Sequence, residues 1–284
     1  MTTIKAPESG SSEHRFIAFD ETPVFYRRFQ AAGAAKGAAV IVHGMGEHGG
    51  RYSHVASYLA DIGIECFVPD LRGFGKSGGR RAYVRRFDVY HEDLAALTQL
   101  AARETSDRVF LVGHSFGGLI TSSFVAYRKP KIQGLALSSP IFGIAISVPS
   151  WRRVLGLVAS RVWPTYAQGS GVDPATLTHD PVILEAYKRD SLIFHQITAR
   201  LYTELDAMLR RRDAIASRID CPTLLLQAGE DRVVSRPAAL AFFDALRTQD
   251  KQLEVYEGLF HEIFNESERQ KVLTRLGRWM LDKM

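Results

Sequence analysis

The sequence predicts an α/β fold in which a mainly parallel central sheet has helices on both faces and a helical cap is inserted into the chain. Two observations lead to this class. Short apolar runs alternate with segments of helical periodicity over residues 1–139 and again over residues 206–284. From residue 140 to 205 the alternation stops for longer than a connection within a compact domain needs. We therefore expect residues 1–139 and 206–284 to form one core, with residues 140–205 as a cap (lid) insertion.

The elements on either side of the insertion follow from local patterns. A hairpin is expected over 16–20 and 24–29, because both runs alternate and a turn containing proline separates them. The segment 52–62 has helical periodicity, and Gly63 suits the end of that helix. The remaining expected strands cover 38–43, 64–68, 109–112, 131–138, 223–227 and 253–256, and the remaining helices cover 89–104, 237–246, 267–281 and a segment ending near 126.

A strand running into Gly113-His114-Ser115-Phe116-Gly117 and then into a helix carries the strongest functional signal. A serine hydroxyl is a weak nucleophile, so an enzyme must hold it exposed, beside a base and beside donors for an oxyanion. The nucleophile elbow of the α/β-hydrolase fold does this with a strand, a very tight turn and a helix, and glycines leave room for the turn. The pattern predicts Ser115 as the catalytic nucleophile and the backbone N–H of Phe116 as an oxyanion donor.

The acid and the base should follow Ser115 in the order acid, then histidine, as they do in this fold. Catalytic groups collect at the carboxyl ends of parallel strands. Asp231 follows the strand expected over 223–227, and His261 follows the strand expected over 253–256. His261 would accept the Ser115 proton, and the acid would hold the imidazole tautomer and stabilise the imidazolium. Glu230 lies next to Asp231 and is the competing acid.

A second oxyanion donor is expected in the loop after the strand 38–43. This loop reads His43-Gly-Met-Gly46, and its glycines allow close approach to a substrate. In the α/β-hydrolase fold one N–H comes from the corresponding loop. The backbone N–H of Met45 is therefore the second predicted donor.

The other histidines are assigned structural roles. His114 is expected to point away from the serine face of the turn. His91 and His195 are expected on helices, and His179 is expected in a polar loop.

No cofactor or metal is implied. Gly73-Phe-Gly-Lys-Ser-Gly78 matches the dinucleotide fingerprint G-x-G-x-x-G, but a basic loop follows it where the fingerprint requires a helix. A P-loop would need glycine at position 70, which is Asp70. Both nucleotide-binding hypotheses are therefore rejected.

Charge and composition favour a cytoplasmic protein that does not bind nucleic acid. A net charge of +5 is modest, and no basic stripe is interleaved with aromatic residues. Cys66 and Cys221 lie in or beside apolar runs, as reduced core thiols do. No run of apolar residues approaches the length of a membrane span.

Two segments suggest contact with lipid, and each has a plainer interpretation. Six basic residues and no acid lie between positions 72 and 86, which would suit anionic headgroups or a solvated loop. In the cap, apolar and basic residues recur at helical spacing, which would suit an interfacial helix or a lid packed over the site. These residues are Trp151, Leu155, Val158 and Val162, with Arg152, Arg153 and Arg161 on other faces.

Five motifs together resemble the monoacylglycerol lipase and lysophospholipase family of serine hydrolases. They are His43-Gly-Met-Gly-Glu-His-Gly-Gly-Arg-Tyr52, Asp70-Leu-Arg-Gly-Phe-Gly-Lys-Ser77, Gly113-His-Ser-Phe-Gly117, Gly229-Glu-Asp231 and Glu257-Gly-Leu-Phe-His261. The resemblance covers the chain from the hairpin to the last helix and is weakest in the cap. It implies hydrolysis of single-chain lipid esters through Ser115, Asp231 and His261, and it selects Asp231 over Glu230.

The resemblance also implies two residues on the substrate side of the site, and at one position this chain differs from the family. Glu47 and Arg51 match positions near the polar end of the family's site, as a structural pair or as contacts to glycerol. Phe116 stands where methionine is most frequent, a change expected to alter the width of the pocket beside Ser115. A serine aminopeptidase or short-chain esterase of the same fold is the alternative, and a non-catalytic lipid-binding protein is the alternative from another class.

Overall fold

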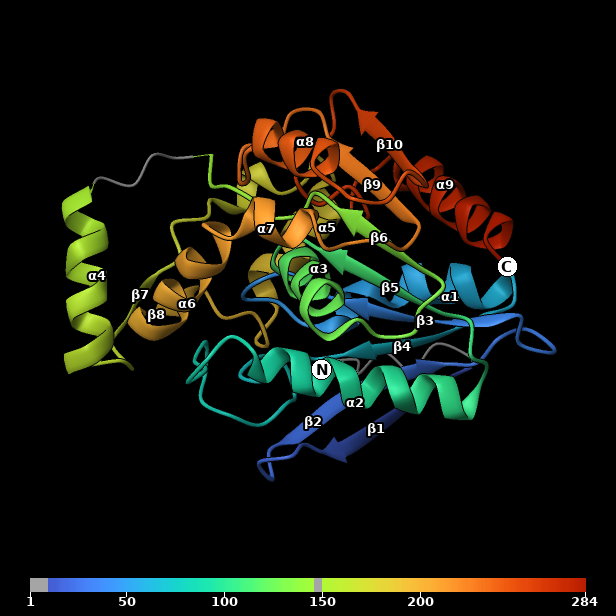
Figure 1. Cartoon of the computed structure of the whole chain (residues 1–284), viewed down its shortest axis with the longest axis horizontal. Coiled ribbons are helices and arrows are strands. Elements are labelled where there is room, and N and C mark those ends of the chain that lie inside the picture. Colours follow the sequence, from blue (N-terminus) through green and yellow to red (C-terminus); the bar gives the residue numbers. More distant parts are fainter. Residues whose placement is uncertain (1–9, 146–149) are drawn as a thin grey trace.

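The computed structural model describes residues 10–145 and 150–284, and within them it forms one eight-stranded sheet flanked by helices (Figure 1). The strand order is β1-β2-β4-β3-β5-β6-β9-β10. Neighbouring strands pair in parallel except β1 with β2 and β2 with β4, so the predicted mainly parallel α/β class is confirmed. The strands are β1 (Ser11–Ile17), β2 (Pro23–Phe29), β3 (Gly37–Val42), β4 (Ile64–Pro69), β5 (Val109–His114), β6 (Gly134–Ser138), β9 (Thr223–Ala228) and β10 (Lys251–Tyr256).

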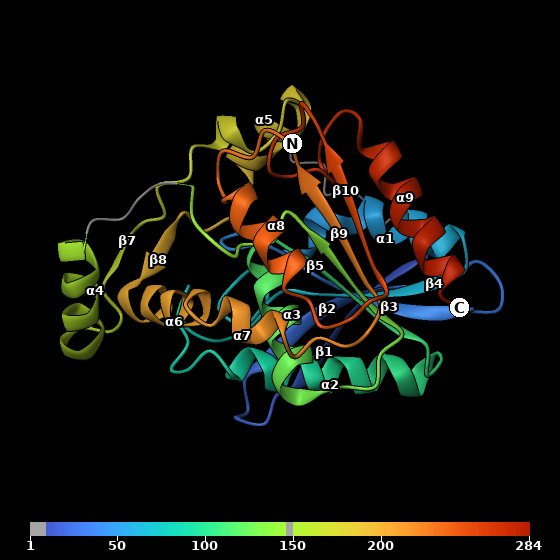
Figure 2. The same cartoon turned by 45° about the horizontal axis from the view of Figure 1, so that its top comes forward.

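Helices cover both faces of this sheet (Figures 1 and 2). On one face lie α2 (Val89–Glu104), α3 (Phe116–Arg128) and α8 (Arg236–Asp244), and on the other lie α1 (Ser53–Asp61) and α9 (Arg269–Asp282). Successive residues of a strand point to opposite faces. In β3, Val40 and Val42 therefore pack with α2 and α3, whereas Ile41 packs with α1 and α9. Burial on both faces explains why the central strands are continuously apolar.

The segment between β6 and β9 forms helices and a small two-stranded sheet, and its part around the β7–β8 pair lies at one end of the molecule (Figure 1). Its helix α4 packs on α6, with Ser160 hydrogen-bonded to Thr203 at 2.8 Å. The expected cap boundary at residue 205 falls inside α6, whose Leu201 and Leu205 are buried in the main core. The elements are α4 (Ser150–Val162), β7 (Ala167–Gly169), η2 (Pro174–Thr176), α5 (Pro181–Arg189), β8 (Gln196–Thr198), α6 (Ala199–Leu209) and α7 (Arg212–Ala216).

Most element boundaries agree with the sequence to within a few residues. The strand expected over 131–138 begins only at Gly134, because Lys129 ends α3 in a left-handed conformation and Pro130 follows it. The side chains of Trp151, Arg152, Arg153 and Leu155, which the cap prediction used, lie outside the described residues. None of the helices in the described part of the chain is long and apolar enough to cross a membrane.

Candidate active site

Ser115 occupies the tip of a strained turn between β5 and α3. Its φ of 50° and ψ of −114° form a conformation that residues other than glycine rarely adopt. Hydrogen bonds on both sides hold this turn, since the Ser115 N–H donates to Ser138 O at 3.0 Å and its carbonyl accepts from Gly118 N at 3.0 Å. Ser115 is 8% exposed, whereas its neighbours Phe116 and Leu119 are fully buried.

Glycines make this turn possible, as the sequence predicts. A Cβ on Gly113 would lie 2.4 Å from Thr121 Oγ1, and one on Gly117 would lie 2.2 Å from the carbonyl oxygen of Val42. Both separations are far below van der Waals contact. The elbow therefore packs directly against the end of β3, which carries the loop with Met45.

The loops after β9 and β10 bring Asp231 and His261 together. His261 Nδ1 lies 2.8 Å from Asp231 Oδ2, while Asp231 Oδ1 accepts hydrogen bonds from the N–H groups of Val233 and Val234, each at 2.9 Å. Burial alone would lower the pKa of His261, but the Asp231 carboxylate raises this pKa above its usual value of 6.5. Burial likewise acts to raise the pKa of Asp231, yet the His261 charge and these hydrogen bonds lower it.

The competing acid Glu230 has a different environment. Its carboxylate lies 3.8 Å from Arg232, and its side chain is half exposed. No hydrogen bond links it to His261 within the described residues. The geometry therefore places Asp231, and not Glu230, on the imidazole.

The loop after β3 and the start of α3 both adjoin Ser115. Gly44 adjoins the nucleophile so closely that a Cβ there would lie 3.4 Å from Ser115 Cβ. The next residue is Met45, and Phe116 begins α3. No described residue accepts a hydrogen bond from the N–H of Met45 or Phe116. Free donors at these two positions are what a developing oxyanion requires.

Glu47 and Arg51 form a buried ion cluster with Glu262, and this cluster is hydrogen-bonded to the loop that carries Met45. Glu47 accepts hydrogen bonds from Gly44 N at 2.6 Å, Tyr52 OH at 2.7 Å and Arg51 at 2.5 Å. Arg51 also binds both oxygens of Glu262, at 2.8 and 2.6 Å. Burial acts to raise the pKa of Glu47, but the Arg51 charge lowers it overall. These contacts favour the structural interpretation of the pair over contact with glycerol.

Glu262 is the main residue of this site that the sequence analysis missed. It follows His261 directly and is 4% exposed, with a hydrogen bond from Asn265 Nδ2 at 3.0 Å as well as those from Arg51. A charged residue beside the predicted base, in the otherwise apolar run 259–264, was the available signal. Through Arg51 it joins the loop that carries Met45 to the loop that carries His261.

Two histidine expectations are wrong. The His114 ring does not point away from the site, because its centroid lies 4.9 Å from that of His261. Its Nδ1 lies 3.1 Å from Ser138 Oγ, and burial lowers its pKa to about 4. His195 lies in the loop before β8 and not on a helix. His91 does lie on α2, and His179 lies in a loop as expected.

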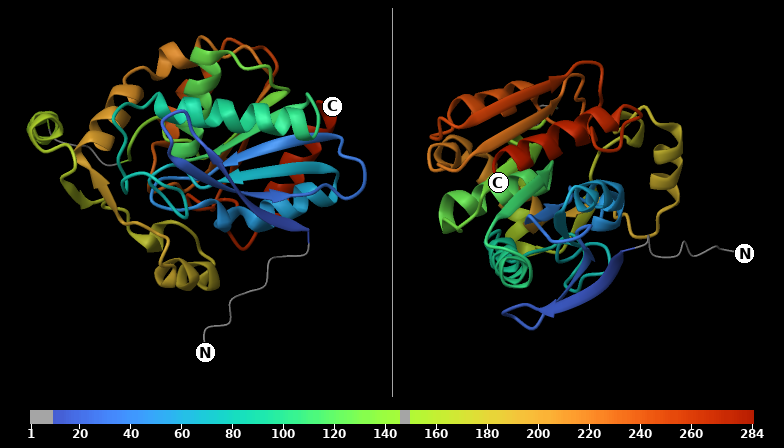
Figure 3. Two further views of the ribbon diagram at one scale, coloured as in Figure 1. Left: turned by 90° about the horizontal axis from the view of Figure 1, so that it is seen from below. Right: turned by 90° about the vertical axis from the view of Figure 1, so that its right-hand side faces the viewer.

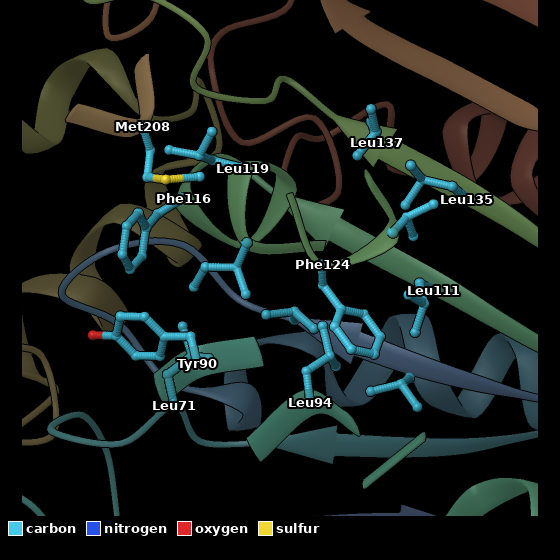
Figure 4. Packing of buried hydrophobic residues seen from close by; sticks show 14 of the residues in the cluster. Leu71, Tyr90, Leu94, Leu111, Phe116, Leu119, Phe124, Leu135, Leu137 and Met208 are labelled. Atoms are coloured by element: carbon cyan, nitrogen blue, oxygen red, sulfur yellow. The ribbon is translucent and has the colours of Figure 1, made fainter. Parts of the chain in front are cut away.

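The expected effect of Phe116 on a substrate pocket finds no support in its packing. Its ring is fully buried, with centroids 5.5 Å from Tyr90 and 5.9 Å from Phe87 in edge-on contacts. Figure 4 shows the ring directed into the core beside Tyr90 and Met208. Phenylalanine in place of methionine at position 116 therefore changes the packing of the core rather than the width of a substrate pocket.

The segment after α5 docks onto the Met45 loop. Phe194 N donates to Gly46 O at 2.7 Å, and His48 Nε2 lies 2.8 Å from Asp190 Oδ2. Arg51 stacks over the Tyr187 ring at 4.9 Å from its centroid. Part of the insertion thus contacts the loop that offers an oxyanion donor.

Across the described ranges 10–145 and 150–284, no three His, Cys, Asp or Glu side chains are grouped as a metal ion would require. The chemistry that the geometry can perform is proton transfer and nucleophilic attack.

Known proteins share both the sequence pattern and the fold. The profile of the family described as "Serine aminopeptidase, S33" matches residues 33–268. A monoacylglycerol lipase of Mycolicibacterium smegmatis is 29% identical over 97% of this chain and 99% of its own length. Phospholipase YtpA of Bacillus subtilis is 32% identical over 82% of this chain and 90% of its own. The crystal structure of Paleococcus ferrophilus monoacylglycerol lipase superposes with a TM-score of 0.85 at 27% identity, covering 92% of this chain and 99% of that one.

Proposed function

Since the chain belongs to the α/β-hydrolase family described as "Serine aminopeptidase, S33", we propose that it hydrolyses carboxylic esters of single-chain lipids through an acyl-enzyme. Monoacylglycerols and lysophospholipids are the proposed substrate classes, because similar proteins are named as monoacylglycerol lipases and a phospholipase. The observation that carries the proposal is the Asp231–His261 pair, whose imidazole packs against His114, the residue before the elbow serine.

In the proposed reaction Ser115 Oγ attacks the ester carbonyl carbon while His261 Nε2 accepts the hydroxyl proton. The carbonyl oxygen becomes an oxyanion and receives hydrogen bonds from the N–H groups of Met45 and Phe116. His261 then gives its proton to the leaving alkoxide, which departs as an alcohol and leaves the acyl group on Ser115. A water molecule, deprotonated by His261, attacks the acyl-enzyme and releases the fatty acid. Asp231 keeps Nε2 free by holding the proton on Nδ1.

Ester hydrolysis fits the site better than aminopeptidase activity. An aminopeptidase needs a carboxylate that can bind the ammonium group of its substrate. The buried carboxylates described above are already paired, Glu47 and Glu262 with Arg51 and Asp231 with His261. A substrate ammonium would have to displace one of these partners.

The insertion has exposed apolar side chains, as a cap that contacts a lipid membrane would need. We propose that residues 140–205 cover the site and touch a membrane peripherally, as access to a lipid ester requires. Apolar side chains are exposed where α4 ends, namely Val162 at 81% and the next residue, Trp163, at 63%. We also propose a cytoplasmic location, because Cys66 and Cys221, the two cysteines of the chain, are free thiols.

A hydrolysis panel tests the proposed function. Monoacylglycerols, lysophospholipids, p-nitrophenyl esters and aminoacyl amides would be compared on the wild type, Ser115→Ala and the exposed-serine control Ser217→Ala. We expect turnover of the lipid esters by the wild type and the control, and its loss in Ser115→Ala. Faster cleavage of aminoacyl amides would favour the aminopeptidase, and lipid binding without turnover of any ester would favour the non-catalytic alternative.

A further inference from the structure

An apolar surface is exposed where α4 ends. Val158, Val162, Trp163 and Tyr166 are between 46% and 81% exposed, and the Trp163 and Tyr166 ring centroids lie 5.5 Å apart. We refer to these four residues as the cap patch. Large contiguous apolar groups are seldom left in water without a partner. Tryptophan and tyrosine are also the residues that favour the headgroup level of a bilayer.

The basic run between positions 72 and 86 divides into two parts in the structure. Arg72 is buried and binds Asp20 and Asp93, each at 2.6 Å, while Lys76 binds Glu13 at 2.6 Å. These two residues are therefore neutralised. The exposed residues that remain are Arg80, Arg81, Arg85 and Arg86, which we call the arginine loop.

Most charges of the arginine loop are unpaired. Arg86 binds Asp88 at 3.0 Å, but no described carboxylate lies within ion-pair distance of Arg80, Arg81 or Arg85. The loop backbone is nevertheless well anchored. Ala82, Val84 and Phe87 are buried in the core, and Phe87 N donates to Glu204 Oε2 at 2.9 Å. The arginines are thus presented on a fixed backbone, which reduces the entropy lost when they bind a ligand.

The segments that carry the cap patch and the arginine loop are both hydrogen-bonded to residues 198–199, where α6 begins. The carbonyl of Tyr166 accepts a hydrogen bond from Ala199 N at 2.8 Å, and the hydroxyl of Thr198 donates to Ala82 O at 2.5 Å. Consecutive residues therefore hold the backbones of both segments. Figures 1 and 3 show α4, the β7–β8 pair and the loop after β4 at the same end of the molecule.

We propose that the cap patch and the arginine loop form one docking surface for a bilayer that contains anionic lipids. This proposal rests on the membrane contact of the proposed function and adds the lipid charge and a second contact element outside the cap. Guanidinium groups pair bidentately with phosphate, and the aromatic rings enter the headgroup region beside them. A nucleic acid would use the arginines but would leave the valines of the cap patch without a partner.

Vesicle sedimentation tests the surface directly. Phosphatidylcholine vesicles with and without phosphatidylglycerol would be titrated with the wild type and with the triple variant Arg80→Gln, Arg81→Gln, Arg85→Gln. We expect the triple variant to bind the anionic vesicles about 100-fold more weakly, roughly fivefold for each arginine. The matched control replaces the exposed Arg103, Arg108 and Arg278, which lie at the other end of the sheet, with glutamine. It should keep most of the wild-type affinity.

Separate measurements test the cap patch and the competing ligand, duplex DNA. The variant Trp163→Ala, Tyr166→Ala should weaken binding to both kinds of vesicle, because it removes a contact that does not depend on lipid charge. Equal affinities of the two arginine triples, or equal binding of the wild type to neutral and anionic vesicles, would overturn the proposal. The proposal would also be overturned if the arginine-loop variant lost binding to duplex DNA but bound vesicles as the wild type does. Circular dichroism and the thermal unfolding midpoint confirm that each variant is folded.

The wild type separates failure of this surface from failure of the proposed function. Turnover of p-nitrophenyl butyrate without vesicles reports only on the catalytic site. Anionic-vesicle binding without ester turnover would retain the surface and reject the hydrolase. Ester turnover without preference for anionic vesicles would retain the hydrolase and reject the docking surface.

Discussion

The imidazole rings of His114 and His261 pack against each other, with centroids 4.9 Å apart and planes inclined at 51°. His114 is bound in turn to Ser138 Oγ, and the carbonyl of Ser138 accepts the N–H of Ser115. Burial lowers the pKa of His114 to about 4, so this ring is neutral near pH 7. A neutral ring can support His261 without repelling the imidazolium that forms during catalysis. We therefore interpret His114 as a positioning residue for both the base and the elbow.

Replacing His114 with phenylalanine should lower kcat about fivefold and leave KM nearly unchanged. The substitution keeps an aromatic ring beside His261 but removes the hydrogen bond to Ser138, which contributes about 1 kcal/mol. Steady-state kinetics on a soluble ester would measure the split. His91→Phe is the control, because His91 is also buried and bonded to a serine, Ser123, but lies on α2. Equal losses in both variants would reduce the role of His114 to general packing.

Asp231→Asn should lower kcat by about 10³–10⁴-fold, since the asparagine no longer holds the correct tautomer of His261. The pH profile should change as well. In the wild type, kcat/KM should fall as the pH drops below the pKa of His261, which lies above its usual 6.5 because Asp231 raises it. Without the carboxylate this pKa decreases, so the acidic limb should move to lower pH.

Glu230→Gln is the control for that prediction, since it changes the neighbouring carboxylate. Glu230 is exposed and has no hydrogen bond or ion pair with His261 within the described chain, so both kcat and the acidic limb should stay near their wild-type values. A larger effect at Glu230 than at Asp231 would reassign the acid.

Local patterns were sufficient for most strands of the main sheet and for the long helices, although the strand expected over 16–20 lies at Ser11–Ile17, and long-range contacts were not predictable. Asp231 and His261 follow apolar runs that end at the same edge of the sheet, so their proximity could be expected. Glu262 binds Arg51 across 211 positions of sequence, and His48 binds Asp190 across 142. No local pattern encodes such pairs. The expectation for His114 failed because strand alternation does not continue through Ser115, where φ is 50°.

Arg51→Met should destabilise the protein by about 3–5 kcal/mol, because it leaves two buried carboxylates, Glu47 and Glu262, without their counter-charge. Urea unfolding measures the loss. In the wild type the pKa of Glu47 is lowered, so its contribution to stability is present above the usual value of 4.5 and is lost as the pH falls through the folded-state pKa. In Arg51→Met that pKa should rise, and the loss of stability should shrink as acid neutralises the carboxylates.

Arg236→Met is the matched control for this cluster. Arg236 also binds a glutamate through two nitrogens, but its partner Glu257 is exposed. Breaking an exposed pair should change the free energy of unfolding by no more than about 1 kcal/mol. If the two variants lost equal stability, burial of the Arg51 cluster would have no energetic consequence.

Gly117→Ala should lower both the ester turnover and the free energy of unfolding, whereas Gly169→Ala should change neither. A Cβ on Gly117 would lie 2.2 Å from Val42 O and 2.6 Å from His43 O, so the end of β3 would have to move away from the elbow. That displacement carries Gly44 and Met45 with it and separates the two oxyanion donors. Overpacking of this kind costs typically about 1–3 kcal/mol. Gly169 has no atom within 4 Å of an added Cβ, so its variant reports the effect of the extra methyl alone. Unfolding midpoints and ester turnover of the two variants, measured together, would show whether the contact between β3 and the elbow sets the geometry of the site.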